Sequence, residues 1–220
     1  MSSKTNSLDP RMQAWLQTHA CRPSAAMKTI CDATLIHPEG GMLTSPEQLQ
    51  FLAFLAASIE TKNAIEVGVF TGASALAVAE VLQSNGRLVA CDITDEYLAS
   101  APDAWKEAGV QSNIDLRLAP ALETLQSLLD EGKAKSFQFM YIDADKTNSK
   151  NYFEFGLQLL SSGGIIAIDN MFYGGQVADD NFNDENTVAT RELAAFLVAD
   201  TRIDYSLVPI GDGLALARVL

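Results

Sequence analysis

The chain has 220 residues, of which 48% are apolar and 20% are charged, and 28 Asp and Glu against 15 Lys and Arg give a formal net charge of −13. This composition is typical of a globular protein, and the length suits a single domain spanning residues 1–220. The negative charge argues against a nucleic-acid partner, because proteins that bind the phosphate backbone do so through Lys and Arg.

The first 60 residues predict a set of N-terminal helices. Helix-start patterns occur at Asp9-Pro10 and at the beginning of the segment Pro23–Ile36. A third helix should begin at residues 45–48, where Ser-Pro-Glu-Gln has the pattern of a capping box with Pro at the first helical position. The apolar run Phe51–Ile59 in this helix is too short to cross a bilayer, so we expect no membrane association.

The cysteines and histidines are few and widely spaced. They are Cys21, Cys31, Cys91, His19 and His37. Three separate cysteines predict no disulfide framework and suit a reducing compartment, and the polar N-terminus lacks the apolar core of a signal peptide, so we predict a cytoplasmic protein. The spacings match no paired zinc-knuckle pattern, and we interpret these residues as helix-packing residues instead of zinc ligands.

From residue 61 to residue 220 the sequence predicts an α/β core. Short apolar runs alternate with longer helical segments, which is typical of βαβ units and of a Rossmann-like, mostly parallel sheet with helices on both faces. The runs are at 64–67, 88–91, 114–118, 137–142 and 165–168. Two further runs, 203–210 and 214–219, are joined by only three residues, which predicts an antiparallel C-terminal hairpin at the edge of a seven-stranded sheet.

The end of the first predicted strand is the first candidate binding site, because ligands of open α/β sheets bind beyond the carboxyl ends of the strands. Gly68 and Gly72 would let the backbone approach a ligand, but their spacing is not the dinucleotide fingerprint G-x-G-x-x-G. Glu66 would repel a pyrophosphate and suits a positively charged ligand. Asp92 ends the second strand, where an acidic group commonly binds ribose hydroxyls; the alternative is an Asp that only caps the turn.

The ends of the next two strands carry a candidate metal site. Asp143 follows the run 137–142, whereas Asp169 and Asn170 follow the run 165–168. Three oxygen ligands without His or Cys favour Mg²⁺, with Mn²⁺ and Ca²⁺ as alternatives, and they leave positions open for substrate. Lys146 lies close enough in sequence to act there as a base. The alternative interpretation is a set of solvated loop charges, with the segment 170–186 as a rim or lid.

Taken together, these stretches resemble the cation-dependent class I S-adenosylmethionine O-methyltransferases. This is the family of caffeoyl-CoA O-methyltransferase and, more distantly, of catechol O-methyltransferase. The resemblance extends from about His37 to Leu220, and the stretches that carry it are Gly41–Pro46, Ile65–Gly72, Tyr141–Lys146, Gly163–Asn170 and Gly211–Leu214.

The resemblance implies a role for each matching residue. The S-adenosylmethionine site would comprise Thr44, Glu66, Gly68, Val69, Ser74, Asp92 and Ala121, with Asp143 at its edge. Asp143, Asp169 and Asn170 would hold the divalent cation, and Lys146 would be the catalytic lysine that takes the proton of the methyl acceptor. The resemblance also implies a homodimer.

The acceptor is the part that the resemblance leaves open. Where plant members of the family have a Trp-Asn pair that contacts substrate, this chain has Tyr173-Gly174. Together with the negative charge, this favours a small phenolic vicinal diol over a coenzyme A ester. The alternatives are a hydroxyuridine of tRNA, an NAD-dependent oxidoreductase on a similar sheet, and a non-catalytic ligand-binding module.

Overall fold

A computed structural model describes residues 8–220 of the chain. The part of the predicted helical segment 1–60 that falls on residues 1–7, and most of the polar N-terminus, lies outside the described residues. Within them the N-terminal helices are α1 (Pro10–Ala20), α2 (Ala25–Leu35) and α3 (Pro46–Ser58). The Asp9 carboxylate caps α1 and the Ser24 hydroxyl caps α2, so both predicted helix starts are confirmed to within two residues.

The predicted capping box of α3 is wrong. Pro46 is the first helical residue as expected, but the side chain of Ser45 makes no capping hydrogen bond. The Gln48 side chain does not turn back to the helix N-terminus, because its amide donates to the buried carboxylate of Asp169. A local pattern thus gave the correct helix start and the wrong partner for one of its side chains.

The sheet has seven strands in the order β3-β2-β1-β4-β5-β7-β6, which confirms the predicted fold class. The first five strands are parallel to one another, and β7 is antiparallel to both β5 and β6. The strands are β1 (Asn63–Val67), β2 (Arg87–Asp92), β3 (Ile114–Leu118), β4 (Phe137–Ile142), β5 (Leu160–Ile168), β6 (Ile203–Val208) and β7 (Leu214–Val219). Strand β5 begins earlier than predicted, because the Gly-containing segment before Ile165 continues the pairing through an irregularity in register.

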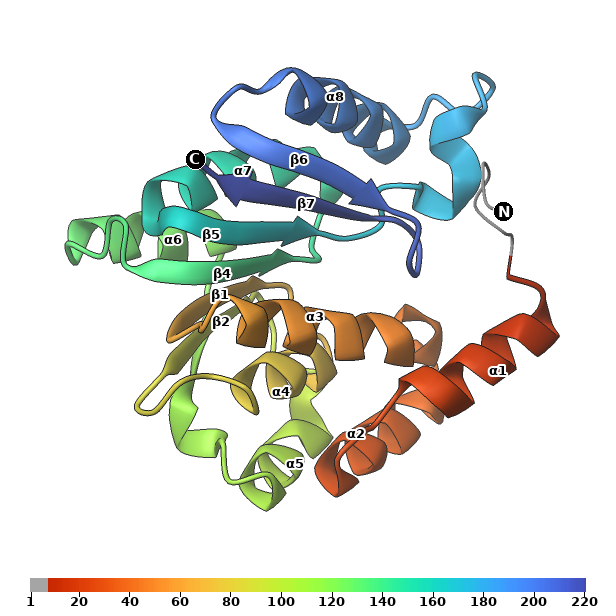
Figure 1. Cartoon of the computed structure of the whole chain (residues 1–220), viewed down its shortest axis with the longest axis vertical. Coiled ribbons are helices and arrows are strands. Elements are labelled where there is room, and N and C mark those ends of the chain that lie inside the picture. Colours follow the sequence, from red (N-terminus) through yellow and green to blue (C-terminus); the bar gives the residue numbers. More distant parts are fainter. Residues whose placement is uncertain (1–7) are drawn as a thin grey trace.

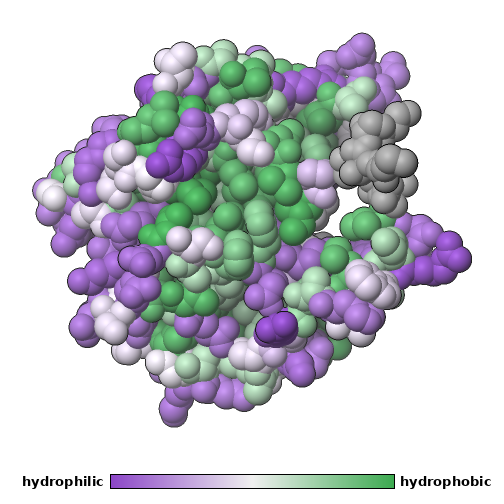
Figure 2. All heavy atoms as spheres, in the orientation of Figure 1, coloured by the Kyte–Doolittle hydropathy of each residue, from purple (hydrophilic) through white to green (hydrophobic). Residues whose placement is uncertain are grey.

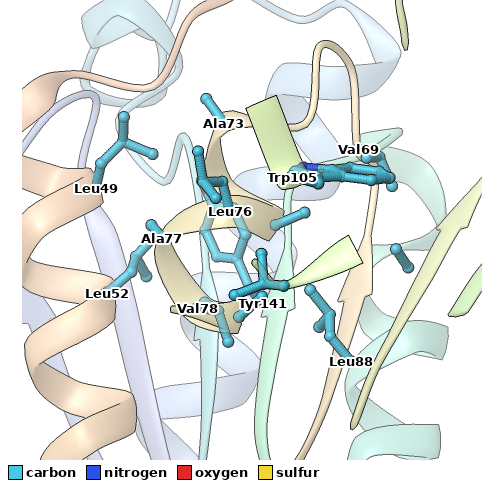
Figure 3. Close-up of a cluster of buried hydrophobic side chains, with 14 of the residues drawn as sticks. Leu49, Leu52, Val69, Ala73, Leu76, Ala77, Val78, Leu88, Trp105 and Tyr141 are labelled. Carbon is cyan, nitrogen blue, oxygen red and sulfur yellow. The ribbon is translucent and has the colours of Figure 1, made fainter. Parts of the chain in front are cut away.

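Helices cover both faces of the sheet (Figure 1). They are α4 (Ala73–Ala79), α5 (Ala101–Glu107), α6 (Ala121–Asp130), α7 (Ser149–Leu159) and α8 (Glu185–Ala199), with short 3₁₀ turns at Gly40–Met42, Leu98–Ser100, Gln111–Asn113, Lys146–Asn148 and Tyr173–Ala178. Successive side chains of β4 point to opposite faces of the sheet and so belong to two separate hydrophobic clusters. Phe139 and Tyr141 pack with α2 to α5, whereas Met140 and Ile142 pack with α6 to α8. Figure 3 shows Tyr141 among the apolar side chains of the first cluster.

The strand order reverses between β1 and β4, because the chain runs from β1 outward to β3 and then returns to the other side of β1. In doubly wound sheets such a switch point opens a crevice at the carboxyl ends of the strands. The residues after β1, β2, β4 and β5 are therefore brought to one edge. Within residues 8–220, no helix is both long and apolar enough to span a bilayer.

Candidate active site

A cavity of about 900 Å³ lies at the carboxyl ends of these strands. Its wall contains all but one of the residues assigned above to the cofactor, the cation and catalysis. Those that line it are Thr44, Gly68, Val69, Ser74, Asp92, Ala121, Asp143, Lys146, Asp169 and Asn170. Glu66 is the exception and lies behind the wall. Over the described part of the chain, no three His, Cys, Asp or Glu side chains form a group that would hold a metal ion.

The turn after β1 closes one side of the cavity. Gly68 has a φ of +89°, and a Cβ atom there would collide with the main-chain carbonyl of Asp143, so only glycine lets the ends of β1 and β4 approach this closely. Gly72 does not line the cavity. The expectation that it admits a ligand is corrected, because its missing side chain makes room for the indole of Trp105, whose N–H donates to the Gly72 carbonyl at 3.1 Å.

Glu66 on β1 is 1% exposed and forms a short hydrogen bond with the Ser74 hydroxyl. Its second oxygen, Oε2, has no hydrogen-bond partner among residues 8–220. Burial raises the pKa of Glu66 to about 8; the Ser74 hydrogen bond opposes this, and the charges of Asp143 and Asp92 add to it. The site therefore disfavours a charged Glu66 unless a positive charge is present.

Asp92 at the end of β2 fixes the backbone of the same turn. Its Oδ2 accepts from the N–H groups of Val69, at 2.8 Å, and Phe70, at 3.1 Å. Its Oδ1 accepts from the N–H of Ile93 at 2.7 Å. Phe70 has a φ of +51°, an unusual value for a residue with a side chain, and the Asp92 carboxylate holds it there. Asp92 thus caps the turn and lines the cavity at once.

The ends of β4 and β5 bring the proposed metal ligands and Lys146 together. The Lys146 Nζ atom lies 2.7 Å from Asn170 Oδ1, 3.6 Å from Asp143 Oδ1 and 3.5 Å from the main-chain oxygen of Asp169. Burial raises the pKa of Asp143 to about 6, and the nearby Asp169 carboxylate adds to this while Lys146 opposes it. The side chains of Asp143 and Asn170 and the main-chain oxygen of Asp169 therefore surround the ammonium group of Lys146.

The sequence interpretation missed two residues that contact Asp169: Gln48, which lines the cavity, and Tyr141, which is buried and does not line it. Tyr141 donates from its hydroxyl to Asp169 Oδ2 at 2.5 Å, and Gln48 donates from its side-chain amide to the same oxygen at 2.6 Å. Burial and the two neighbouring carboxylates raise the pKa of Tyr141 well above its ordinary value, so the hydroxyl keeps its proton. Both side chains are polar yet only 1% exposed, and the sequence alone does not distinguish them from other polar side chains of the same elements, such as Gln50 and Gln138.

The segment 170–186 forms part of the cavity rim and is held by hydrogen bonds to the β6–β7 turn and to α8. Asp212 in the β6–β7 turn accepts from the N–H of Gly174 at 2.9 Å. Arg191 on α8 donates to the carbonyls of Val177, at 2.9 Å, and Phe182, at 2.8 Å. Tyr173, Gly174 and Gln176 line the cavity. The predicted rim is thus an ordered wall that lies next to the proposed metal ligands.

Comparison with known proteins identifies the family. The profile of the O-methyltransferase family matches residues 17–220. The chain belongs to this family. It is 46% identical over 176 residues to a probable caffeoyl-CoA O-methyltransferase 2 of Dictyostelium discoideum, covering 80% of this chain and 76% of that protein. It is 38% identical to the mouse catechol O-methyltransferase domain-containing protein 1, covering 95% of this chain and 80% of that protein.

Solved structures of O-methyltransferases agree with this assignment. An O-methyltransferase from Bacillus cereus in complex with SAH superposes with a TM-score of 0.85 at 26% identity, covering 96% of this chain and 97% of that chain. The predicted resemblance is confirmed, and the protein is an S-adenosylmethionine-dependent O-methyltransferase. The alternatives of an NAD-dependent oxidoreductase and of a non-catalytic binding module are therefore wrong.

Proposed function

We propose that this O-methyltransferase moves the methyl group of S-adenosylmethionine to one hydroxyl of a small phenolic vicinal diol, with the help of a divalent cation. The cation is Mg²⁺ in this proposal, with Mn²⁺ and Ca²⁺ as alternatives. The observation that carries it is the convergence of Asp143, Asp169 and Asn170 beside Lys146 on one cavity wall. The names of the relatives, caffeoyl-CoA and catechol O-methyltransferases, support a phenolic acceptor.

The other side of the cavity fits S-adenosylmethionine, which supplies a methyl group on a positively charged sulfur. Buried Glu66, with an unpartnered Oε2, is a carboxyl that a nearby positive charge would stabilise. Asp92 is fixed at the end of β2, and the exposed side chain of Ile93 offers apolar surface beside it for a purine. We assign this side of the site to Thr44, Glu66, Gly68, Val69, Ser74, Asp92 and Ala121, with Asp143 at its edge.

The β4–β5 side fits a hard divalent cation. Asp143, Asp169 and Asn170 supply two carboxylates and one amide oxygen there, and the single positive charge of Lys146 offsets only one of the two carboxylate charges. A divalent cation bound by Asp143, Asp169 and Asn170 would act as a Lewis acid toward an acceptor hydroxyl. The Lys146 side chain is 12% exposed and lies at the same wall, where it would receive the proton that the hydroxyl loses.

The charges around the cavity argue for an acceptor without phosphate groups. Five aspartates line it, and Lys146 is the one cationic side chain among the described residues that do so. Coenzyme A esters and tRNA carry phosphates, which would find little electrostatic attraction here. A neutral vicinal diol does not need a positively charged site, so we favour a small catechol over a coenzyme A ester and over tRNA.

We also propose a cytoplasmic homodimer in which residues 1–220 act as one methyltransferase domain. Helix α1 has no buried residue among its eleven, and exposes Met12 and Trp15. Figure 2 shows hydrophobic residues gathered across the middle of one face, where no helix covers β5 and β7 in this view. Exposed Phe54 on α3 and Leu207 on β6 are further apolar side chains that a second copy would cover.

The test of the proposed function is an acceptor screen with labelled S-adenosylmethionine. Catechol, caffeate, a flavonoid, caffeoyl-CoA and tRNA bearing hydroxyuridine are each incubated with the protein, with Mg²⁺ or with a chelator. We expect methylation of a small diol that disappears with the chelator. Methylation of only the coenzyme A ester or the tRNA would overturn the proposed acceptor class, whereas full activity in chelator would overturn the proposed cation dependence.

A further inference from the structure

We infer that Tyr141 and Gln48 are positioning residues, which hold the carboxylate of Asp169 in the orientation that a divalent cation requires. The inference rests on the proposed function, because it assumes that Asp169 is a cation ligand. Neither Tyr141 nor Gln48 is itself a proposed ligand. Each acts through Asp169, and together they come from two separate elements, β4 and α3.

Both oxygens of the Asp169 carboxylate are held by neutral donors. Oδ2 accepts from the Tyr141 hydroxyl at 2.5 Å and from the Gln48 amide at 2.6 Å, while Oδ1 accepts from the N–H of Asn170 at 2.7 Å. Lys146 contacts the main-chain oxygen of Asp169 and not its carboxylate. Each carboxylate oxygen has a second lone pair, so Oδ1 keeps a direction free for a cation.

These donors offset a repulsion that the site cannot avoid. Asp169 is only 4% exposed and lies beside Asp143, whose side chain is partly buried, and two such neighbouring carboxylates repel each other when both are charged. The Tyr141 oxygen lies between them, 2.5 Å from Asp169 Oδ2 and 3.5 Å from Asp143 Oδ2. Its single proton is donated to the nearer oxygen. The hydroxyl therefore fixes Asp169 at a set position relative to Asp143 before any cation arrives.

The side chains of Tyr141 and Gln48 are themselves fixed by packing against residues outside the proposed cation site. Both are 1% exposed, and the ring of Tyr141 lies in the apolar cluster of Figure 3. Gln48 packs against Gly211 in the β6–β7 turn, where a Cβ atom would collide with the Gln48 side-chain oxygen. The turn therefore limits the rotamers of Gln48, and the Asp169 carboxylate is aligned through contacts that extend to the C-terminal hairpin.

The test measures cation binding in the absence of cofactor and acceptor. Chelator-treated full-length protein is titrated with Mn²⁺, and free Mn²⁺ is measured by electron paramagnetic resonance. Removing an outer partner of a metal ligand typically weakens metal binding by about 10–100-fold, and we expect Tyr141→Phe and Gln48→Leu each to do so. S-adenosylmethionine affinity and melting temperature should stay close to wild type, which a general loss of packing would not allow.

Two variants control for the loss of a similar hydrogen bond elsewhere. Tyr152→Phe removes a hydroxyl that donates to Asp145 at the same 2.5 Å, and Gln50→Leu removes a side chain of α3 that accepts from the N–H of Arg22. Both should bind Mn²⁺ as tightly as wild type. A second pair tests the turn: Gly211→Ala should weaken Mn²⁺ binding, whereas Gly109→Ala, also at positive φ but facing open space, should not.

The outcomes separate the inference from the proposed function. Wild-type Mn²⁺ affinity in both Tyr141→Phe and Gln48→Leu, with binding lost in Asp143→Ala, would overturn the inference and leave the proposed cation site intact. If Asp143→Ala binds Mn²⁺ as wild type does, or wild type binds none, the proposed site fails and the inference with it. If Tyr141→Phe does not fold, Gln48→Leu decides the question alone.

Discussion

The two sides of the cavity are built in different ways. At the ends of β1 and β2 the backbone does most of the positioning: Gly68 allows two strand ends to meet, and Asp92 holds the N–H groups of the turn. At the ends of β4 and β5, side chains instead position the site residues. The carboxylate of Asp169 is oriented in part by Gln48, 121 positions away in the chain.

In the proposed function, this difference separates the side that binds the cofactor from the side that activates the acceptor. The first side is fixed mainly by hydrogen bonds within the β1–α4–β2 unit, and the long-range contact of Gly68 with the end of β4 adds to them. The second side needs α3, β4, β5 and the β6–β7 turn in place together. We therefore expect substitutions on the β4–β5 side to affect turnover and cation binding most, and those on the β1–β2 side to affect cofactor affinity and stability.

The largest effect is expected on the β4–β5 side, for Asp143→Ala and Asp169→Ala. Either change removes a proposed cation ligand, and the rate of methyl transfer should fall by roughly 10³-fold, as when a main electrostatic group of an active site is lost. Radiolabel transfer at saturating Mg²⁺ measures it, with circular dichroism to show that the fold survives. Asp204→Ala, an exposed ion-pair residue on β6, is the matched control.

Lys146→Ala should come next, with a fall of about 10²-fold in kcat, which is typical for loss of a general base. Because the lysine acts on the proton and not on recognition, KM for the acceptor should change much less. Steady-state kinetics over a range of acceptor concentrations separates the two constants. An unchanged kcat would reject Lys146 as the base, and Lys150→Ala, four residues further along the chain, serves as the control.

On the β1–β2 side, Glu66→Gln should weaken S-adenosylmethionine binding by about tenfold, because the carboxylate charge that would attract the positively charged cofactor is lost. Isothermal titration calorimetry measures this. Equal affinity in the variant would show that Glu66 does not face the positive charge of the cofactor. The exposed Glu123→Gln is the control.

The same variant has a pH signature in the ligand-free protein. The folded-state pKa of about 8 lies above the ordinary value of 4.5, so the folded state binds the extra proton between these values. Stability should therefore fall as pH rises from 4.5 to 8, by at most about 1.4 kcal/mol per pH unit, and Glu66→Gln should remove this contribution. Urea unfolding of both proteins at several pH values tests it; parallel curves would contradict the assigned burial effect.

The smallest effect on activity is expected for Gly72→Ala. A Cβ atom would press on the Trp105 ring at a positive φ, which should cost about 1–3 kcal/mol of stability as in other overpacked cores. The residue does not line the cavity, so cofactor affinity in the folded fraction should stay near wild type. Thermal unfolding and calorimetry together measure both. A large loss of affinity without loss of stability would place Gly72 in the binding site after all.

The sequence predicted what depends on local pattern and topology. The alternation of runs and the short link 211–213 were sufficient for the seven-stranded sheet and its antiparallel hairpin, because strand direction follows from connection length. The rule that ligands bind at the carboxyl ends of strands correctly predicted that Asp92, Asp143 and Asp169 line one cavity. Each of these predictions used only neighbouring residues or the order of the strands.

The sequence did not reveal contacts between distant side chains. The pattern at residues 45–48 favoured a capping box, yet the Gln48 amide donates to Asp169, because the buried carboxylate that follows β5 is a stronger hydrogen-bond acceptor than a neutral backbone group. The role of Tyr141 was hidden in the same way, as one hydroxyl in an apolar strand. Such pairings depend on which faces meet in the folded core, and one sequence does not specify that.

The most direct test of the central claim is methyl transfer to a small catechol as Mg²⁺ is added back to chelator-treated protein. We predict that wild-type activity is absent without the cation and rises to saturation with Mg²⁺, while Asp143→Ala shows no Mg²⁺-dependent rise although it still binds S-adenosylmethionine. Full wild-type activity in chelator, or an identical Mg²⁺ response in Asp143→Ala, would contradict the account.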